Sequence, residues 1–227
     1  MSDQPPSADL LRSLGRLVRG LSALFWSLPA SLVVGFHTLK SEGMLPFAFA
    51  PVLVCTAILS YGLWLLGDFQ KQERVWRAAL DRARLLALIV FGLSPFLYWY
   101  NRVPSNSFFL TMVGLLAFCA LLLLAALNLV LQRLGAMLPD EMLRHELRQY
   151  TVINLNLILV TIVLAIIYLG AGQLKWIPRW LGALLETFHR GTLWFLIPLV
   201  LLPLAMTMAL LWKTKEVILE SVFSSKH

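Results

Sequence analysis

Two short stretches of the sequence contain residue types that begin known catalytic motifs. His145 and Glu146 match the first half of a zinc-hydrolase helix, but Gln149 stands where the second histidine ligand is needed. Residues 92–95 read Gly-Leu-Ser-Pro and match the start of a nucleophile elbow, but Phe96 replaces its final glycine. The four histidines are scattered, and neither cysteine has the neighbours of a metal or redox motif. We therefore expect no enzyme activity, no cofactor and no metal site.

The polar residues that stand out are amides inside long apolar stretches. Asn128 lies about one turn before the end of one stretch, and Asn154 lies about one turn into the next. On consecutive antiparallel helices these positions have similar depth, so we expect their side chains to form a hydrogen bond. Thr151 and Thr161 share a helical face with Asn154, whereas Asn156 projects elsewhere, toward a partner subunit. Two interpretations of this polar contact remain open: a joint between helices, or a patch that recognises a lipid headgroup or a substrate.

Arginines gather on two amphipathic segments beside the apolar stretches. In residues 8–21, apolar side chains cover one helical face and three arginines lie opposite, which is typical of a helix at the membrane interface. Residues 74–84 repeat this design at smaller scale. We expect two helices lying on the membrane, whose basic faces either dock a protein partner or rest on lipid headgroups. The candidate docking residues are Arg12, Arg16, Arg19, Arg77 and Arg84.

Six apolar stretches carry no ionised side chain in their interiors, and each is a candidate membrane span. The chain is 59% hydrophobic and 14% charged over 227 residues, whereas soluble domains are about 25% charged. A bilayer core of about 30 Å needs about 20 apolar residues per helix. Because Pro29 lies in the middle of the first stretch, that segment either spans fully or re-enters. The expected spans are residues 20–39, 45–67, 85–100, 108–131, 150–170 and 193–212.

Lysine and arginine are distributed unequally over the connecting segments. With the N-terminus placed in the cytoplasm, fourteen of the 19 basic residues fall on the cytoplasmic side and five on the other. This asymmetry predicts that both termini face the cytoplasm from an inner membrane. The net charge of +7 then reflects topology and anionic lipid rather than nucleic-acid binding. Residues 139–169 have no glycine or proline after Pro139, which predicts one helix that begins outside the bilayer.

These patterns predict an all-α, polytopic membrane protein. Residues 1–19 form a cytoplasmic tail with an amphipathic interfacial helix, residues 20–212 a six-helix transmembrane domain, and residues 213–227 a second cytoplasmic tail. The layout resembles the permeases of ABC-2-type exporters, which have an N-terminal interfacial helix, six spans and a cytoplasmic helix between spans two and three. That resemblance implies an export permease driven by a separate ATPase. Our leading hypothesis is a non-catalytic subunit or assembly partner of a larger membrane complex, bound to protein partners or to copies of itself.

Overall fold

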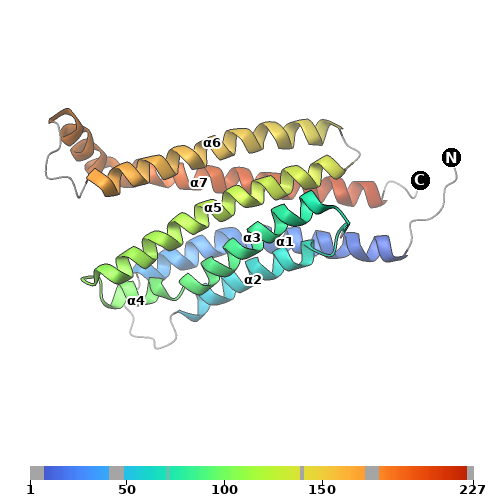
Figure 1. The fold of residues 1–227 in the computed structure, drawn as a ribbon, viewed down its shortest axis with the longest axis horizontal. Coiled ribbons are helices and arrows are strands. Elements are labelled where there is room, and N and C mark those ends of the chain that lie inside the picture. The colour runs from blue at the N-terminus through green and yellow to red at the C-terminus, as the bar shows by residue number, and fades with distance from the viewer. Residues whose placement is uncertain (1–7, 41–48, 71, 139–140, 172–178, 224–227) are drawn as a thin grey trace.

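The computed structural model describes residues 8–40, 49–70, 72–138, 141–171 and 179–223, and these fold into a bundle of helices (Figure 1). Within that part of the chain there is no β-strand. Helix α1 begins and helix α7 ends at the same end of the bundle, which we call the terminal end. The opposite end is called the far end. The helices are α1 (Ala8–Lys40), α2 (Ala50–Leu66), α3 (Arg74–Leu93), α4 (Phe96–Arg102), α5 (Ser107–Met137), α6 (Glu141–Ala171) and α7 (Arg179–Phe223).

Helix α1 is one continuous element, which differs from the expected surface helix followed by a span. It runs for 33 residues and passes through Pro29 without ending, so the re-entrant alternative is not supported. Leu17 and Leu21 are both 0% exposed. Protein therefore covers this apolar face, where lipid was expected. The interfacial helix expected over residues 8–21 is not a separate element but the first part of α1, and its Leu17 and Leu21 side chains pack into the bundle.

Helix α3 likewise absorbs the short surface helix expected over residues 74–84. It begins at Arg74 and continues to Leu93 without a break. Trp76 and Leu80 are 0% and 1% exposed, so their side chains pack inside the protein and do not rest on the bilayer. A break follows at Pro95, which cannot donate the hydrogen bond that the Phe91 carbonyl would otherwise accept. The hydroxyl of Ser94 donates to that carbonyl oxygen at 2.8 Å.

Four helical segments of the described chain are long and apolar enough to cross a membrane, which indicates a membrane protein. Helix α2 is apolar but has 17 residues. Helix α7 contains the sixth expected stretch, of which residues 193–197 have side chains outside the described set. The expectation of one long helix over residues 139–169 is confirmed by α6 from Glu141 onward, and residues 139–140 lie outside the described residues. The four segments are Arg12–Lys40, Arg74–Arg102, Ser107–Met137 and Arg144–Ile167.

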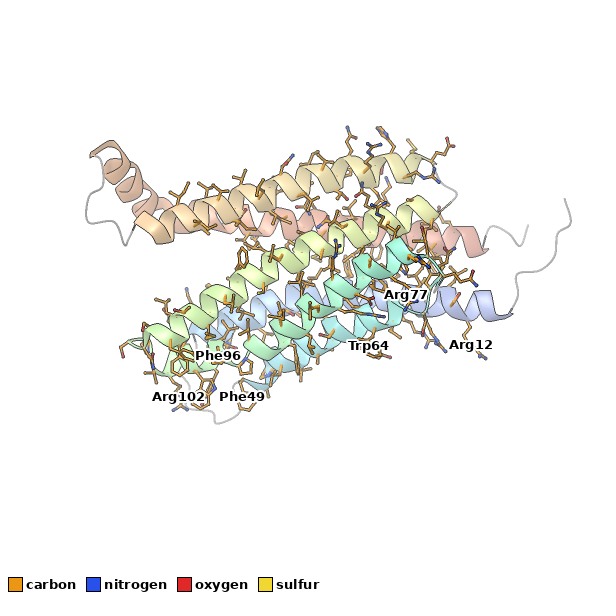
Figure 2. The ribbon with its side chains drawn as sticks, in the orientation of Figure 1. Arg12, Phe49, Trp64, Arg77, Phe96 and Arg102 are labelled. Carbon is orange, nitrogen blue, oxygen red and sulfur yellow. The ribbon has the colours of Figure 1, made fainter. Side chains whose placement is uncertain are left out.

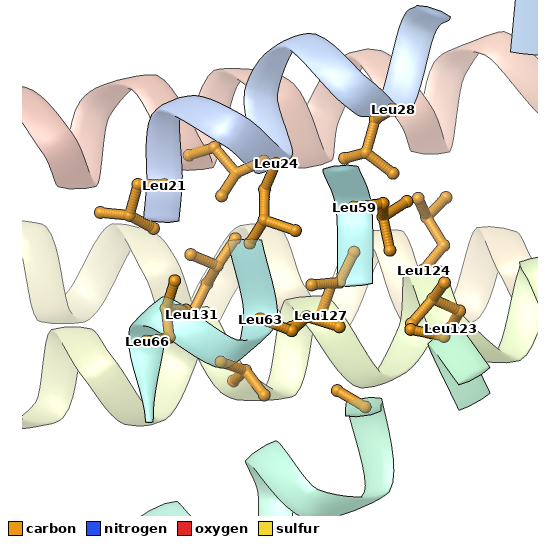
Figure 3. Close-up of a cluster of buried hydrophobic side chains, with 14 of the residues drawn as sticks. Leu21, Leu24, Leu28, Leu59, Leu63, Leu66, Leu123, Leu124, Leu127 and Leu131 are labelled. Carbon is orange, nitrogen blue, oxygen red and sulfur yellow. The ribbon is translucent and has the colours of Figure 1, made fainter. Parts of the chain in front are cut away.

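The core between α1, α2 and α5 consists mainly of leucines (Figure 3). Close packing of α1 and α2 depends on two glycines that face each other. A Cβ atom added at Gly20 would lie 2.4 Å from Leu66 Cδ1 and 2.9 Å from the carbonyl oxygen of Gly62. A Cβ atom added at Gly62 would lie 3.1 Å from the carbonyl oxygen of Gly20. Small residues of this kind let the backbones of membrane helices approach closely.

Aromatic side chains gather at the far end, around α4 and the start of α5. The rings of Trp99 and Phe109 stack with centroids 6.4 Å apart. Phe96 contacts both Phe108 and Phe109, and Figure 2 shows Phe96 and Arg102 at this end. Aromatic belts of this kind are typical of membrane–water interfaces. Helix α4 and the start of α5, at the far end of the bundle, are therefore suited to the membrane–water interface.

Candidate functional site

A closed cluster of amide and hydroxyl groups joins α5, α6 and α7 in the middle of the bundle. The Asn154 amide nitrogen donates to Asn128 Oδ1 at 3.0 Å, so the contact expected between these two side chains is present. The same nitrogen lies 3.0 Å from Thr207 Oγ1 and 3.1 Å from the Pro203 carbonyl oxygen. Asn128 Nδ2 donates to Thr207 Oγ1 at 2.9 Å and to the Leu124 carbonyl oxygen at 2.8 Å. Asn128, Asn154 and Thr207 are each 0% exposed.

Helix α6 brings its share of the cluster together through a repeat of alternating four and three residues. Side chains at this spacing lie on one face of a helix and pack against neighbouring helices. All five are at most 3% exposed. We call this face the inner seam of α6. Its members are Leu147, Thr151, Asn154, Ile158 and Thr161.

The cluster surrounds a proline inside α7. Pro203 lacks the backbone N–H that would bond to the carbonyl oxygen of Leu199. Thr161 Oγ1 of α6 lies 3.4 Å from that oxygen. One turn later, the Pro203 carbonyl oxygen accepts from Thr207 Oγ1 at 2.8 Å and from Asn154. A side chain of α6 therefore reaches the backbone carbonyl that the proline leaves without its N–H donor, as membrane helices require.

The arrangement can do little chemistry but can hold helices together. Its side chains are neutral amides and hydroxyls, with no acid, base or nucleophile among the members named. Each cross-helix hydrogen bond in a membrane is worth about 0.6–1.7 kcal/mol. Because the cluster is fully covered by protein, it offers no surface to a headgroup or substrate. Of the two interpretations left open by the sequence, the geometry supports the joint between helices. The Oδ1 atom of Asn154 is buried with no partner in the described part of the chain.

Sequence reasoning missed Thr207 and Pro203, which complete the cluster. They lie 53 and 49 residues from Asn154 in the chain. A local signal does exist, because Thr207 follows Pro203 by four residues and its hydroxyl reaches the proline carbonyl. Thr151 contributes at the edge, with its Oγ1 atom 3.4 Å from the Asn128 carbonyl oxygen.

The five candidate docking arginines separate into two groups in the structure. Arg16 is paired with Asp68, beyond the end of α2. Arg84 reaches back to α2, where Nε lies 3.3 Å from the Leu63 carbonyl oxygen and Nη2 lies 3.2 Å from that of Trp64. These two arginines therefore tie the bundle together. Arg12, Arg19 and Arg77 take no part in these two contacts, and their side chains are exposed.

Gly67 makes room for the Arg84 guanidinium. A Cβ atom added at Gly67 would lie 1.7 Å from Nη2 of Arg84. The guanidinium also lies over the Trp64 ring, with its carbon 5.4 Å from the ring centroid. Positive charge at the last carbonyl groups of a helix is favourable. Arg84 thus closes the C-terminal end of α2.

The helix ends of α5, α6 and α7 are also tied together at the terminal end. Leu147 of α6 packs directly over Gly135 of α5, where an added Cβ atom would lie 2.1 Å from Leu147 Cδ1. Arg144 Nη2 donates to the Leu138 carbonyl oxygen at 3.2 Å, just past the end of α5. Glu146 of α6 pairs with Lys213 of α7. These contacts fix the relative positions of three helix ends that carry charged residues.

Comparison of the chain with protein-family models, with curated proteins and with solved structures finds no match. Two features that carried the resemblance to ABC-2 permeases, the N-terminal interfacial helix and the helix between spans two and three, are parts of α1 and α3. No group of three His, Cys, Asp or Glu residues in the described segments is placed to hold a metal ion. The cluster and the tied helix ends are therefore the features from which function has to be argued.

Proposed function

We propose that this chain is a non-catalytic subunit or assembly partner of a larger complex in the inner (cytoplasmic) membrane. Under this proposal it crosses the membrane six times and keeps both termini in the cytoplasm. The observation that supports it best is the set of helix ends at the terminal end, which are joined to one another by side chains. A protein partner can recognise such a fixed arrangement of charged helix ends.

The charges available at this end are basic. Figure 2 shows Arg12 and Arg77 together at the terminal end of the bundle. Arg19, about two turns from Arg12 on the same face of α1, is exposed as well. Arg16 and Arg84 hold these helices in place through their contacts with Asp68 and with the end of α2. A partner that docks here should present acidic side chains, because complementary charge guides the encounter and fixes the register.

The test uses the full-length chain, affinity-tagged and purified from its native membrane in mild detergent. Changing Arg12, Arg19 and Arg77 together to Gln should remove a partner that the wild type retains. A matched control changes three other exposed arginines of the same side, Arg74, Arg82 and Arg133, to Gln. Both variants lose three charges and keep the excess of basic residues that sets topology. Equal retention of partners by wild type and the first variant would contradict the docking proposal.

The same purification separates this proposal from the permease alternative. A complex without a nucleotide-binding subunit, and without ATP hydrolysis, supports a scaffold or assembly role. A retained nucleotide-binding subunit whose ATP hydrolysis falls when Arg77 is changed to Gln would identify a permease instead. The two outcomes are exclusive because a scaffold has no nucleotide turnover that depends on α3.

A further inference from the structure

Helix α6 carries a second seam on the face opposite the inner seam. Its members again alternate at spacings of four and three residues, the repeat of a coiled coil. Every one of them is exposed in the single chain. We call this face the outer seam of α6. It consists of Gln149, Ile153, Asn156, Val160, Val163 and Ile167.

The outer seam borders a groove between α6 and α7. The groove has a volume of about 580 Å³ and is apolar except for Asn156. Its other lining residues are Ile153, Leu157, Val160, Pro198, Leu199 and Leu202.

The Asn156 amide lies at a depth where lipid cannot satisfy it. It follows Arg148 by eight residues, which is about 12 Å along the helix, and lies within the apolar segment Arg144–Ile167. An amide transferred to an apolar medium without a hydrogen-bond partner costs roughly 2–7 kcal/mol. A hydrocarbon tail can fill the groove but has no donor or acceptor for the amide. The occupant of this face therefore needs a polar group at the depth of Asn156.

We propose that the occupant is a second copy of this chain, which packs α6 against α6 about a two-fold axis along the membrane normal. Copies inserted in the same orientation have parallel α6 helices, so each residue meets its own counterpart at equal depth. An amide carries both donors and an acceptor, and two Asn156 side chains satisfy each other. Self-complementary two-fold interfaces are the commonest in homo-oligomers.

The residue types of the outer seam favour two strands. With Ile153, Val160 and Ile167 at the first core position of the heptad, Gln149, Asn156 and Val163 take the second. β-branched residues at the first core position of parallel helices favour two strands. Along the seam, residues 153, 160, 163 and 167 are 45–50% exposed and β-branched. These side chains can enter the holes of a facing helix, as the inner seam of α6 already does within the bundle.

The test measures association of the purified full-length chain in phosphatidylcholine vesicles, by counting labelled copies while the ratio of protein to lipid is lowered. The wild type should dimerise, and Asn156→Leu should raise its dissociation constant about 3- to 20-fold, the loss of one interhelical hydrogen bond. The matched variant Asn156→Gln keeps the donors and acceptor and should stay within about threefold of wild type. A monomeric wild type, or a dimer unaffected by Asn156→Leu, would overturn the proposal.

Cysteine cross-linking locates the interface independently of stability. In a background with Cys55 and Cys119 changed to Ala, the single variants Val160→Cys and Val163→Cys keep Asn156 and should form disulfide-linked dimers on oxidation. Ile166 is 60% exposed but is turned away from the seam on the same helix, so Ile166→Cys should cross-link at least fivefold less. Equal cross-linking at Ile166 and Val163 means random collision, and contradicts a defined α6 interface. If lipid and not a second chain fills the groove, cross-linking should likewise show no preference for Val163 over Ile166, and the proposal is contradicted.

Discussion

Two asparagines on α6 lie only two positions apart, but one is buried inside the bundle and the other is exposed on the opposite face of the helix. Asn154, on the inner seam, is 0% exposed, and its amide nitrogen has three acceptors within 3.1 Å. Asn156, on the outer seam, is exposed beside an apolar groove. The same residue type therefore joins helices within the bundle at position 154 and is available for association with another chain at position 156. Each face can be altered without touching the other, so the comparison is open to experiment.

The largest effect is expected from removing the buried amide. Asn154→Leu removes the contacts of the amide nitrogen with Asn128 Oδ1, the Pro203 carbonyl oxygen and Thr207 Oγ1. Asn128 Oδ1 then loses the donor that Asn154 supplied, so the variant should lower the free energy of unfolding by about 2–3 kcal/mol. Asn156→Leu should change that free energy by less than about 0.5 kcal/mol, because the site is exposed. Unfolding of the monomer in mixed micelles with increasing dodecyl sulfate measures both. Equal losses for the two variants would remove the distinction between the faces.

The glycine contact between α1 and α2 gives a second contrast between packed and open sites. Gly20→Ala should destabilise the chain by about 1–3 kcal/mol, because its Cβ atom has no room against Gly62 and Leu66. Gly114, in α5, has nothing within 4 Å of an added Cβ atom. Gly114→Ala is therefore the matched control and should be neutral or slightly stabilising. The same unfolding assay checks the pair, and a loss at Gly114 equal to that at Gly20 would contradict the packing argument.

Coupling between Asn128 and Asn154 sharpens the account of the inner seam. In a double-mutant cycle to Leu, the two single losses should exceed the loss of the double variant by about 0.6–1.7 kcal/mol. A parallel cycle between Asn128 and Asn156 provides the control, since the second residue is on the other face of α6. Strict additivity in the first cycle would mean that the two buried amides do not meet.

The smallest effect concerns the arginines of α3. Arg84→Gln removes the guanidinium that lies over the Trp64 ring and near the last carbonyl groups of α2. It should lower the free energy of unfolding by about 0.5–1 kcal/mol. Arg77→Gln, about two turns closer to the terminal end, should leave the free energy of unfolding unchanged because the Arg77 side chain is on the surface. Thermal unfolding of the detergent-solubilised chain compares the two. A larger loss at Arg77 would mean that the exposed arginine, and not Arg84, holds α3.

Part of the cluster could be predicted because helix ends define depth. Asn128 and Asn154 lie near adjacent ends of consecutive apolar stretches, so their contact follows from counting residues along the chain. Thr207 and Pro203 could not be found in this way, since they come from α7, whose register against α6 is set by packing between distant segments. The Gly20–Gly62 contact could not be predicted for the same reason, because the sequence identifies small residues but does not say which of them face each other.

The surface helices were wrongly expected because two environments produce the same pattern. An apolar face opposite arginines is typical of a helix on lipid, but it equally suits a helix end covered by protein. Leu17 and Trp76 are both 0% exposed, which places their segments in the second class. Six apolar stretches follow from composition, whereas the pairing of helices into a bundle depends on contacts that hydropathy alone does not encode.

The most direct test measures folding and association on the same two variants. Unfolding in micelles and dimer dissociation in vesicles should be determined for wild type, Asn154→Leu and Asn156→Leu. The account predicts that Asn154→Leu loses folding stability, whereas Asn156→Leu folds normally and weakens association about 3- to 20-fold. If instead Asn156→Leu unfolds the chain, or associates as tightly as wild type, the division of labour between the two faces of α6 is contradicted.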